Sequence, residues 1–308
     1  MEHEKRKTPN PTKNKRNTDT RTMLTDYHIH PDYSMDALPI SIDRYCERAV
    51  ELGLREICFT THFELDPLRE QMDNFVIYKG KKHPVSDYRW LDGYLQEIQD
   101  AGDSYESDGL AVKAGVEIGY DLGLGKEVEK VVEAYPFDFV LGSVHCLDHT
   151  AISSMEESPK YFSTHSLSQT REDYFNILNE AVETGLFHCI AHIDLYRRYG
   201  YEYYGPNVNT IHRGVIEGIF KEMAHRGMGL EVNTSARRRG FPDFHPSEEI
   251  LSMAVKAGVE VYTVGSDAHR LEDLGCGIED ALELLNKYGV HNHIFYQGRA
   301  VPLIEGMP

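Results

Sequence analysis

Histidine and acidic side chains recur along this chain in types and spacings that suit metal binding. Six histidines and three acids stand near the ends of short apolar segments: His28, His30, Asp36, His62, Glu117, His145, His192, Asp267 and His269. The pairs His28/His30 and Asp267/His269 are each separated by one residue, so a strand presents both members to the same side. A single zinc ion takes about four ligands. The set therefore predicts two or three divalent transition metals, with Glu117 available to bridge them, and suits Zn, Mn or Fe.

A purely structural role is a good alternative to metal binding for one histidine but a poor one for the whole set. A lone histidine at a strand end is more often a hydrogen-bonded core or surface residue. Ligand-type residues at the same end of nearly every strand are much harder to explain in that way. The other ten of the 16 histidines are interpreted as ordinary, and His245, which follows a strand end, is the least ordinary of them.

Five arginines follow two of the predicted strands. Arg197 and Arg198 come after the fifth strand, and Arg237, Arg238 and Arg239 come after the sixth. A guanidinium group binds phosphate through two parallel hydrogen bonds and stays charged at any working pH. These groups predict a site for a small anionic substrate, although a solvated basic turn is the ordinary alternative for each arginine.

Strands and helices must alternate to bring these side chains together. The expected strands cover 23–30, 55–60, 110–120, 137–145, 186–193, 227–235, 259–267 and a short segment near 293–297. The expected helices cover 42–52, 87–102, 125–134, 170–185, 209–226, 247–257 and about 272–287. About seven such units predict an α/β fold with a parallel, closed barrel, whose C-terminal strand ends share one face. Two long connections, 64–86 and 147–168, are expected to form walls or lids there.

Composition narrows the function classes. The 308 residues are 41% hydrophobic, which excludes wholesale disorder, and the net charge of −18 disfavours long nucleic acid and membrane surfaces as partners. No apolar stretch approaches the length of a membrane span. Five cysteines without a CxxC pair predict reduced thiols in a cytoplasmic protein. Residues 1–22 are basic and polar and predict a disordered tail, followed by a single domain over 23–308.

Seven short blocks together resemble the PHP (polymerase and histidinol phosphatase) superfamily. They are DYHIH with a following Asp (26–36), FTTH (59–62), GVEIGY (115–120), GSVH (142–145), AHIDL (191–195), EVNTS (231–235) and GSDAH (265–269). The SVH block, the NTS-x-x-R stretch and the overall length are most similar to the stand-alone histidinol-phosphatase branch. The resemblance implies a distorted (β/α)7, TIM-like barrel with a trinuclear site on the nine ligands named above. Its phosphate-binding arginines fall on Arg198 (or Arg197) and Arg238.

This resemblance implies hydrolysis of a phosphate monoester, L-histidinol phosphate first, to the alcohol and phosphate by a metal-bridging hydroxide. Asp267 or His269 is expected to orient the nucleophile. Arg197, Arg198, Arg237 and Arg238 are expected to hold the phosphoryl group, and Glu64 and Asp66 the cationic end of the substrate. The alternatives are a phosphoesterase acting on another small phosphate or a dinucleotide, and a non-catalytic metal-binding module. The oligomeric state stays open.

Overall fold

Seven parallel strands in chain order form the central sheet of the computed structural model, which describes residues 23–304. The segment 1–22, for which the sequence predicts a disordered tail, lies outside the described residues. Each strand pairs with the next one along the chain in the order β1-β2-β5-β6-β9-β10-β11. The strands are β1 (Thr25–Ile29), β2 (Glu56–Glu64), β5 (Ala111–Gly119), β6 (Phe139–Ser143), β9 (Cys189–Ile190), β10 (Gly229–Asn233) and β11 (Tyr262–Gly265).

The two edge strands of this sheet, β1 and β11, meet at their C-terminal ends. Ile29 and Ala268 form a parallel bridge, in which the His30 amide donates to the Ala268 carbonyl at 2.9 Å. The Ala268 amide in turn donates to the His28 carbonyl at 3.2 Å. The sheet is therefore nearly closed into a distorted (β/α)7 barrel, as predicted, and its closure point lies among the predicted ligands.

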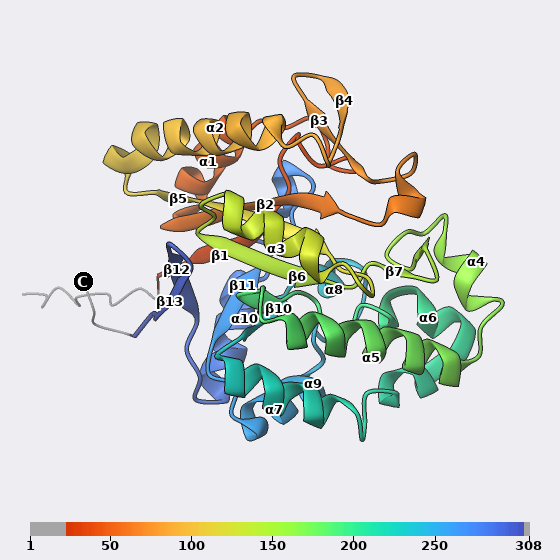
Figure 1. Cartoon of the computed structure of the whole chain (residues 1–308). Coiled ribbons are helices and arrows are strands. Elements are labelled where there is room, and N and C mark those ends of the chain that lie inside the picture. Colours follow the sequence, from red (N-terminus) through yellow and green to blue (C-terminus); the bar gives the residue numbers. More distant parts are fainter. Residues whose placement is uncertain (1–22, 305–308) are drawn as a thin grey trace, which may run out of the picture.

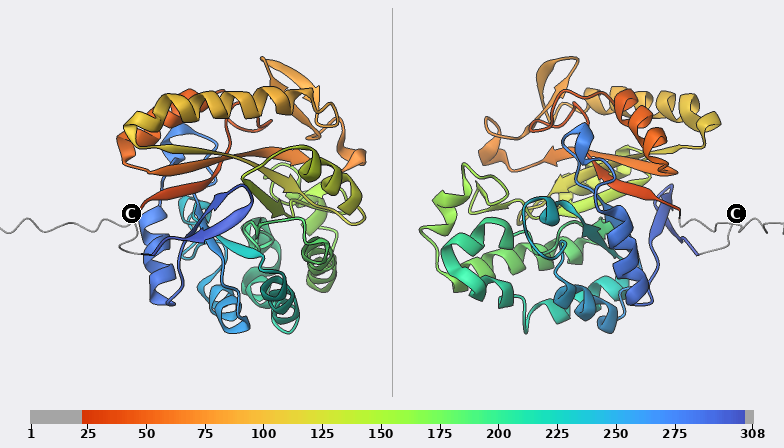
Figure 2. Two further views of the ribbon diagram at one scale, coloured as in Figure 1. Left: turned by 60° about the vertical axis from the view of Figure 1, so that its left-hand side comes forward. Right: turned by 180° about the vertical axis from the view of Figure 1, so that it is seen from behind.

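Helices cover the outside of the barrel. Figure 1 and both views of Figure 2 show α1 and α2 on one side and α5, α7 and α9 on the opposite side. The long helices are α1 (Ile42–Leu52), α2 (Arg89–Tyr105), α3 (Gly125–Ala134), α5 (Leu167–Thr184), α7 (Ile216–Arg226), α9 (Glu248–Ala257) and α10 (Ile278–Lys287). The shorter ones are α4 (Ser158–Phe162), α6 (Arg197–Tyr204) and α8 (Ser235–Arg238). Within residues 23–304, no helix is both long and apolar enough to cross a bilayer.

Local sequence explains where these helices begin and end. Ser41 caps α1 by accepting a hydrogen bond from the Arg44 amide, and Gly53 ends the helix with a left-handed φ of 75°. Ser247 caps α9 in the same way through the amide of Ile250. These capping residues stand next to the helices that they begin or end, so the helices are fixed by their own residues as well as by packing.

Antiparallel hairpins occupy the connections around the barrel. The connection 64–86 contains β3 (Phe75–Tyr78) and β4 (Lys81–Pro84), and the connection 147–168 begins with β8 (Thr150–Ala151), which pairs with β7 (Cys146–Leu147). A third hairpin, β12 (His293–Tyr296) and β13 (Arg299–Pro302), closes the other end of the barrel. There Phe295 packs on Tyr27 and Phe139, with ring centroids 6.1 and 4.7 Å away.

Some expectations from the sequence are wrong in detail. The helix expected over 209–226 begins only at Ile216, because Gly214 takes a positive φ of 79° and interrupts it. The short strand expected near 293–297 is confirmed as β12, which pairs antiparallel with β13 outside the seven-stranded sheet. The sequence also gave no sign of α6, whose first residue is Arg197.

Candidate metal centre

The predicted ligands gather at one end of the barrel. β1 carries His28 and leads into His30, β2 carries His62, and β5 carries Glu117. The remaining ligands follow the C-terminal ends of β1, β6, β9 and β11: Asp36, His145, His192, Asp267 and His269. Parallel strands bring all nine to one rim, and eight are largely enclosed, whereas the Asp36 side chain is 54% exposed.

Glu117 lies at the centre of this cluster and is fully buried. Its Oε2 lies 3.3 Å from His28 Nε2, 3.5 Å from His30 Nε2 and 3.0 Å from His62 Nδ1. Its Oε1 lies 3.2 Å from His145 Nε2 and 2.9 Å from His192 Nε2. The two oxygens of one carboxylate thus face two different sets of imidazoles, which is the arrangement of a bridging ligand.

The nine side chains divide into three groups around Glu117. The first group is His28, His30 and Asp267 with Glu117 Oε2, and the two Nε2 atoms lie 3.8 and 3.5 Å from Asp267 Oδ1. The second group is His145 and His192 with Glu117 Oε1, and their Nε2 atoms are 3.4 Å apart.

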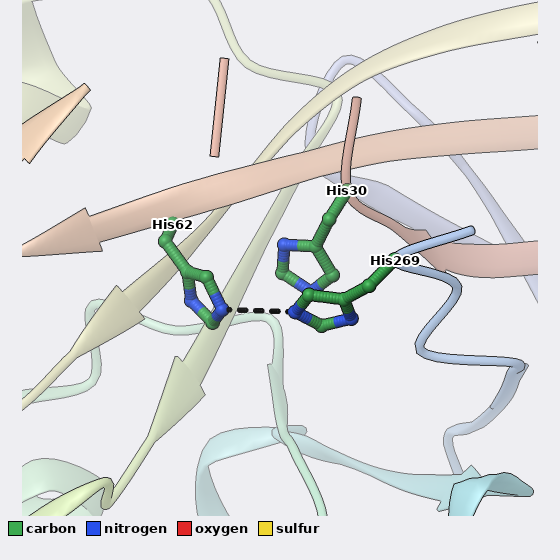
Figure 3. Close-up of side chains that lie close together, drawn as sticks. All are labelled: His30, His62 and His269. Carbon is green, nitrogen blue, oxygen red and sulfur yellow. Dashed lines mark hydrogen bonds between the residues drawn. The ribbon is translucent and has the colours of Figure 1, made fainter. Parts of the chain in front are cut away.

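The third group is Asp36, His62 and His269. The Nε2 atoms of the two histidines are 3.4 Å apart and lie 3.5 and 3.3 Å from the Asp36 oxygens. Figure 3 shows His62 and His269 pointing toward one another, with the His30 ring stacked beside them. His30 therefore borders both the first group and the third.

Unpartnered buried atoms show that cations fit this centre. His28 Nε2, His30 Nε2, His62 Nδ1 and Glu117 Oε2 are all buried and have no hydrogen-bond partner. Buried polar atoms left without a partner are costly, and native proteins rarely tolerate several in one place. Imidazole nitrogens and carboxylate oxygens are the donor set that suits Zn, Mn or Fe, so bound divalent ions would satisfy His28 Nε2, His30 Nε2 and Glu117 Oε2. His62 would face an ion through Nε2, which leaves its Nδ1 toward Glu117 Oε2 at 3.0 Å.

Outer partners orient the rings. His28 Nδ1 lies 2.6 Å from Glu231 Oε1, and His145 Nδ1 lies 2.7 Å from Glu64 Oε1. Such carboxylates hold the outer nitrogen of a metal-binding histidine and fix its tautomer. A third ring, that of His30, has a hydroxyl in this place, since its Nδ1 lies 3.1 Å from Ser34 Oγ.

Two glycines make room for these carboxylates. A Cβ on Gly119 would lie 1.9 Å from Glu64 Oε2, and a Cβ on Gly265 would lie 2.4 Å from Glu231 Oε1. The carboxylate of Glu64 therefore lies over β5 at Gly119, and that of Glu231 lies over β11 at Gly265. Any larger residue at either glycine would occupy the space of the carboxylate.

Opposite charges hold the acids of the centre ionised. Burial acts to raise the pKa of Glu117, but the imidazoles of His28 and His145 outweigh it and hold this pKa well below its usual range. The pKa of Asp267 is lowered in the same way, against burial, chiefly by His28 and His30. Burial and the neighbouring rings of His269 and His62 keep the pKa of His30 well below its ordinary value. A neutral imidazole is the form that binds metal.

Two of the predicted ligands have strained backbones. His192 and Asp267 have φ values of 23° and 57°, in the left-handed region that non-glycine residues rarely adopt. Strain of this kind persists where the surrounding structure enforces it, and it is concentrated at functional sites.

The structure separates the arginines that the sequence groups together. Arg198 Nη2 lies 3.6 Å from Asp267 Oδ2, its Nε has no partner, and burial together with Arg239 lowers its pKa to about 10. Arg238 donates to the Asp267 carbonyl at 3.1 Å. Both therefore border the first group.

The other two predicted arginines are engaged elsewhere. Arg197 is buried and paired with Asp194 at 2.5 Å, and Arg237 is exposed and paired with Asp280 at 2.6 Å. Neither guanidinium contacts a predicted ligand among the described residues, so a role in phosphate binding stays a prediction for these two.

A wall of polar side chains stands beside the second group. Glu64, predicted at the cationic end of a substrate, is 7% exposed and holds His145. Further out, Asp66 Oδ2 lies 2.7 Å from His149 Nδ1, and Asp121 Oδ2 lies 3.9 Å from the same nitrogen. Asp66 and Asp121 therefore place carboxylates on the outer rim.

Sequence reasoning missed two of the residues that orient the rings. Glu231 lies on β10 two residues before Asn233, and an acid at that strand end was the available signal. Ser34 gave none, because a serine in the turn after β1 looks like any other turn residue. Both contacts join segments that only the folded chain brings together.

Comparison with known proteins places these residues among related chains. The model of the PHP domain matches residues 26–235. A probable histidinol-phosphatase of Deinococcus radiodurans is 27% identical over 91% of this chain and all of that protein. The histidinol-phosphatase of Lactococcus lactis is 25% identical over 90% of this chain and 95% of that protein.

Solved structures show the same fold. The crystal structure of histidinol phosphate phosphatase from Lactococcus lactis, complexed with zinc, L-histidinol and phosphate, superposes with a TM-score of 0.71 at 22% identity. It covers 91% of this chain and 99% of that chain. A putative histidinol phosphatase from Listeria monocytogenes gives a TM-score of 0.67 at 18% identity, over 83% and 99% of the two chains.

Proposed function

Since this chain belongs to the PHP domain family, we propose that it is a metal-dependent hydrolase of phosphate monoesters. The observation that carries the proposal is the convergence of buried, unpartnered imidazole and carboxylate atoms on Glu117 beside the Arg198 guanidinium. A cluster of cations with an adjacent arginine suits the binding of a phosphoryl group.

We propose L-histidinol phosphate as the substrate. The two relatives named above are a probable histidinol-phosphatase and a histidinol-phosphatase. This chain matches both of them over nearly their whole length. The charges around the site agree with this substrate. Arg198 and Arg238 border the first group and would take the phosphate, whereas the carboxylates of Asp66 and Asp121 line the rim beside the second group and would take a positively charged end. A phosphate ester that also carries a positive charge would bind with its two ends oriented.

The three groups suggest which residues would hold ions. His28, His30 and Asp267 would hold one, His145 and His192 a second, and Asp36, His62 and His269 a third, with Glu117 shared. Bound divalent ions lower the pKa of water and neutralise charge on phosphoryl oxygens. The identity of the metal, among Zn, Mn and Fe, and the number of ions are part of this proposal.

The chain's own residues complete the reaction. Arg198 and Arg238 would hold the phosphoryl oxygens as negative charge shifts during bond breaking. The Asp267 carboxylate, kept ionised by its neighbours, would accept a hydrogen bond from the attacking water and orient it. His269 Nδ1 lies 3.4 Å from Asp267 Oδ1, so the imidazole would fix that carboxylate. The buried walls of the barrel exclude bulk water from the first two groups.

Turnover of L-histidinol phosphate tests the proposal. The metal-loaded protein should hydrolyse it in preference to a panel of other phosphate monoesters and dinucleotides. His30→Ala and Asp267→Ala should each abolish most of this activity in protein resupplied with metal. Equal turnover of all esters would reject the substrate, and undiminished activity in both variants would reject the centre as the active site.

Cellular location belongs to the same proposal. The cysteines are free thiols, and Cys46, Cys58, Cys146 and Cys189 are buried. Unpaired thiols suit a reducing compartment. We therefore propose a cytoplasmic enzyme whose partners are a small phosphorylated substrate and the phosphate that it releases.

A further inference from the structure

Ser34 connects two of the three ligand groups through a single oxygen atom. The residue is 1% exposed and lies in the turn after β1. Its Oγ lies 3.1 Å from His30 Nδ1 and 3.1 Å from the backbone nitrogen of His62. It also lies 2.8 Å from the Oγ1 of Thr61, which is fully buried. Because Ser34 is buried, these three polar neighbours and not solvent complete the hydrogen bonds of its hydroxyl.

Counting protons fixes the direction of these bonds when His30 binds an ion. A hydroxyl has one hydrogen and two lone pairs. The His62 amide always donates, so it takes one lone pair. A neutral His30 that binds metal through Nε2 carries its hydrogen on Nδ1, which takes the second lone pair. Among residues 23–304, the polar contact that remains for the hydrogen of Ser34 is Thr61 Oγ1.

We propose that Ser34 and Thr61 form a positioning pair that sets the tautomer of His30 for a divalent cation. The inference rests on the metal centre of the proposed function. His28 and His145 have the carboxylates of Glu231 and Glu64 at Nδ1, which act there as acceptors and set the tautomer unaided. Ser34 can donate as well as accept, so it sets the right tautomer only while Thr61 accepts its hydrogen.

Removing the Thr61 hydroxyl should therefore reverse the bond between Ser34 and His30. With valine at position 61, the one acceptor left for the Ser34 hydrogen is His30 Nδ1. The ring would then carry its own hydrogen on Nε2, the atom that faces Glu117 and Asp267. A substitution that does not touch the ring would thus oppose the binding of an ion.

Binding of zinc to the metal-free protein, in competition with a chromogenic chelator, tests the pair. In Thr61→Val and Ser34→Ala we expect one bound ion to be held about 10- to 100-fold more weakly than in the unchanged chain. Thr61→Ser keeps the hydroxyl and should bind as the unchanged chain does. Thr60→Val is the matched control, because Thr60 is equally buried on the same strand and accepts from the Ile29 amide instead.

The two substitutions at position 61 separate hydroxyl from shape. Valine keeps the shape and serine keeps the hydroxyl, so a role in packing alone would weaken binding in Thr61→Ser and spare Thr61→Val. That result, or zinc binding in Thr61→Val equal to that of the unchanged chain, would overturn the pair. Thermal unfolding of the metal-free variants checks that each one folds. The measurement is zinc binding and not catalysis. If the zinc affinities of the variants rank as expected but the unchanged chain does not hydrolyse phosphate esters, only the proposed function is refuted.

Discussion

Arg197 and Arg198 are neighbours in the chain, yet the fold gives them different surroundings. Arg197 is the buried partner of Asp194, whose other oxygen lies 2.6 Å from His245 Nδ1. Burial acts to raise the pKa of Asp194, but the charges of Arg197 and His245 hold it well below its usual range. Arg198 instead borders Asp267 with its Nε unpartnered. At the scale of the residue, one arginine stabilises the fold and the other is available to a ligand.

Replacing each arginine with methionine should separate these roles. Arg198→Met should lower kcat/KM for the phosphate ester roughly 10²- to 10³-fold, as the loss of one preorganised donor does. Arg197→Met removes one of the two cationic partners of the buried Asp194 and should lower the free energy of unfolding by about 3 kcal/mol, since His245 still contacts the carboxylate. Steady-state kinetics and denaturant unfolding measure the two effects. Similar losses of activity in both variants, at equal stability, would contradict this division.

At the scale of the element, the two long connections beside the site are joined to each other. Arg69 is 3% exposed and lies in the connection 64–86. Its Nη1 donates to the His149 carbonyl at 2.8 Å and to Glu157 at 2.9 Å, both in the connection 147–168, and its Nε donates to Asp73 at 2.8 Å. The two connections are therefore joined through Arg69, which favours a wall over a lid, the two alternatives that the sequence left open.

Arg69→Met should loosen this wall. The variant leaves two partly buried carboxylates without their cation, and we expect a loss of up to about 3 kcal/mol in the free energy of unfolding. Limited proteolysis should cut the connection 147–168 faster than in the unchanged chain. Arg44→Met, which removes an exposed ion pair with Glu47 on α1, is the control and should cost under about 1 kcal/mol. Equal effects of the two substitutions would show that Arg69 does not join the connections.

At the scale of the whole molecule, stability should depend on metal and on pH in separable ways. The centre ties together side chains from strands at both ends of the sheet, from β1 to β11. An ion that binds the folded chain alone stabilises it by about 2.7 kcal/mol at 100 times its dissociation constant. At the other end of the barrel, away from the metal-binding residues, His188 is a titrating group that contacts none of them.

Removing metal should lower the melting temperature. We expect a chelator to reduce it by roughly 4 °C for each ion released, because about 2.7 kcal/mol is set against an unfolding entropy of about 0.6 kcal/mol per kelvin for a protein of this length. Differential scanning calorimetry with and without added zinc measures the change. In Glu117→Gln the difference should shrink, and a melting temperature independent of metal in the unchanged chain would contradict the proposed centre.

Acid should destabilise the protein through His188. Burial lowers the pKa of His188 to about 4, and its Nδ1 accepts the Val140 amide at 2.8 Å, which requires the neutral ring. The unfolded chain binds this proton near pH 6.5, so the stability is complete above that pH and is lost as pH falls toward 4. The shift corresponds to at most about 3 kcal/mol.

Unfolding of the metal-free protein between pH 7 and pH 4 measures this loss. His188→Asn keeps an acceptor for the Val140 amide without titrating, so its stability should fall less steeply than that of the unchanged chain. His291→Asn alters an exposed histidine and should follow the unchanged chain. A slope in His188→Asn equal to that of the unchanged chain would assign the acid sensitivity to other groups.

The sequence by itself determined the order of the seven barrel strands and the residues at their ends. Caps such as Ser41 and Gly53 act within a few residues, and the alternation of strand and helix dictates a parallel barrel with one functional rim. Tertiary structure alone decided which atoms meet there: that Glu117 shares its oxygens between two groups, that Arg198 rather than Arg197 borders the centre, and that Ser34 touches His30 and His62. These contacts join positions far apart in the chain at distances of about 3 Å, and spacing along the sequence holds no information at that precision.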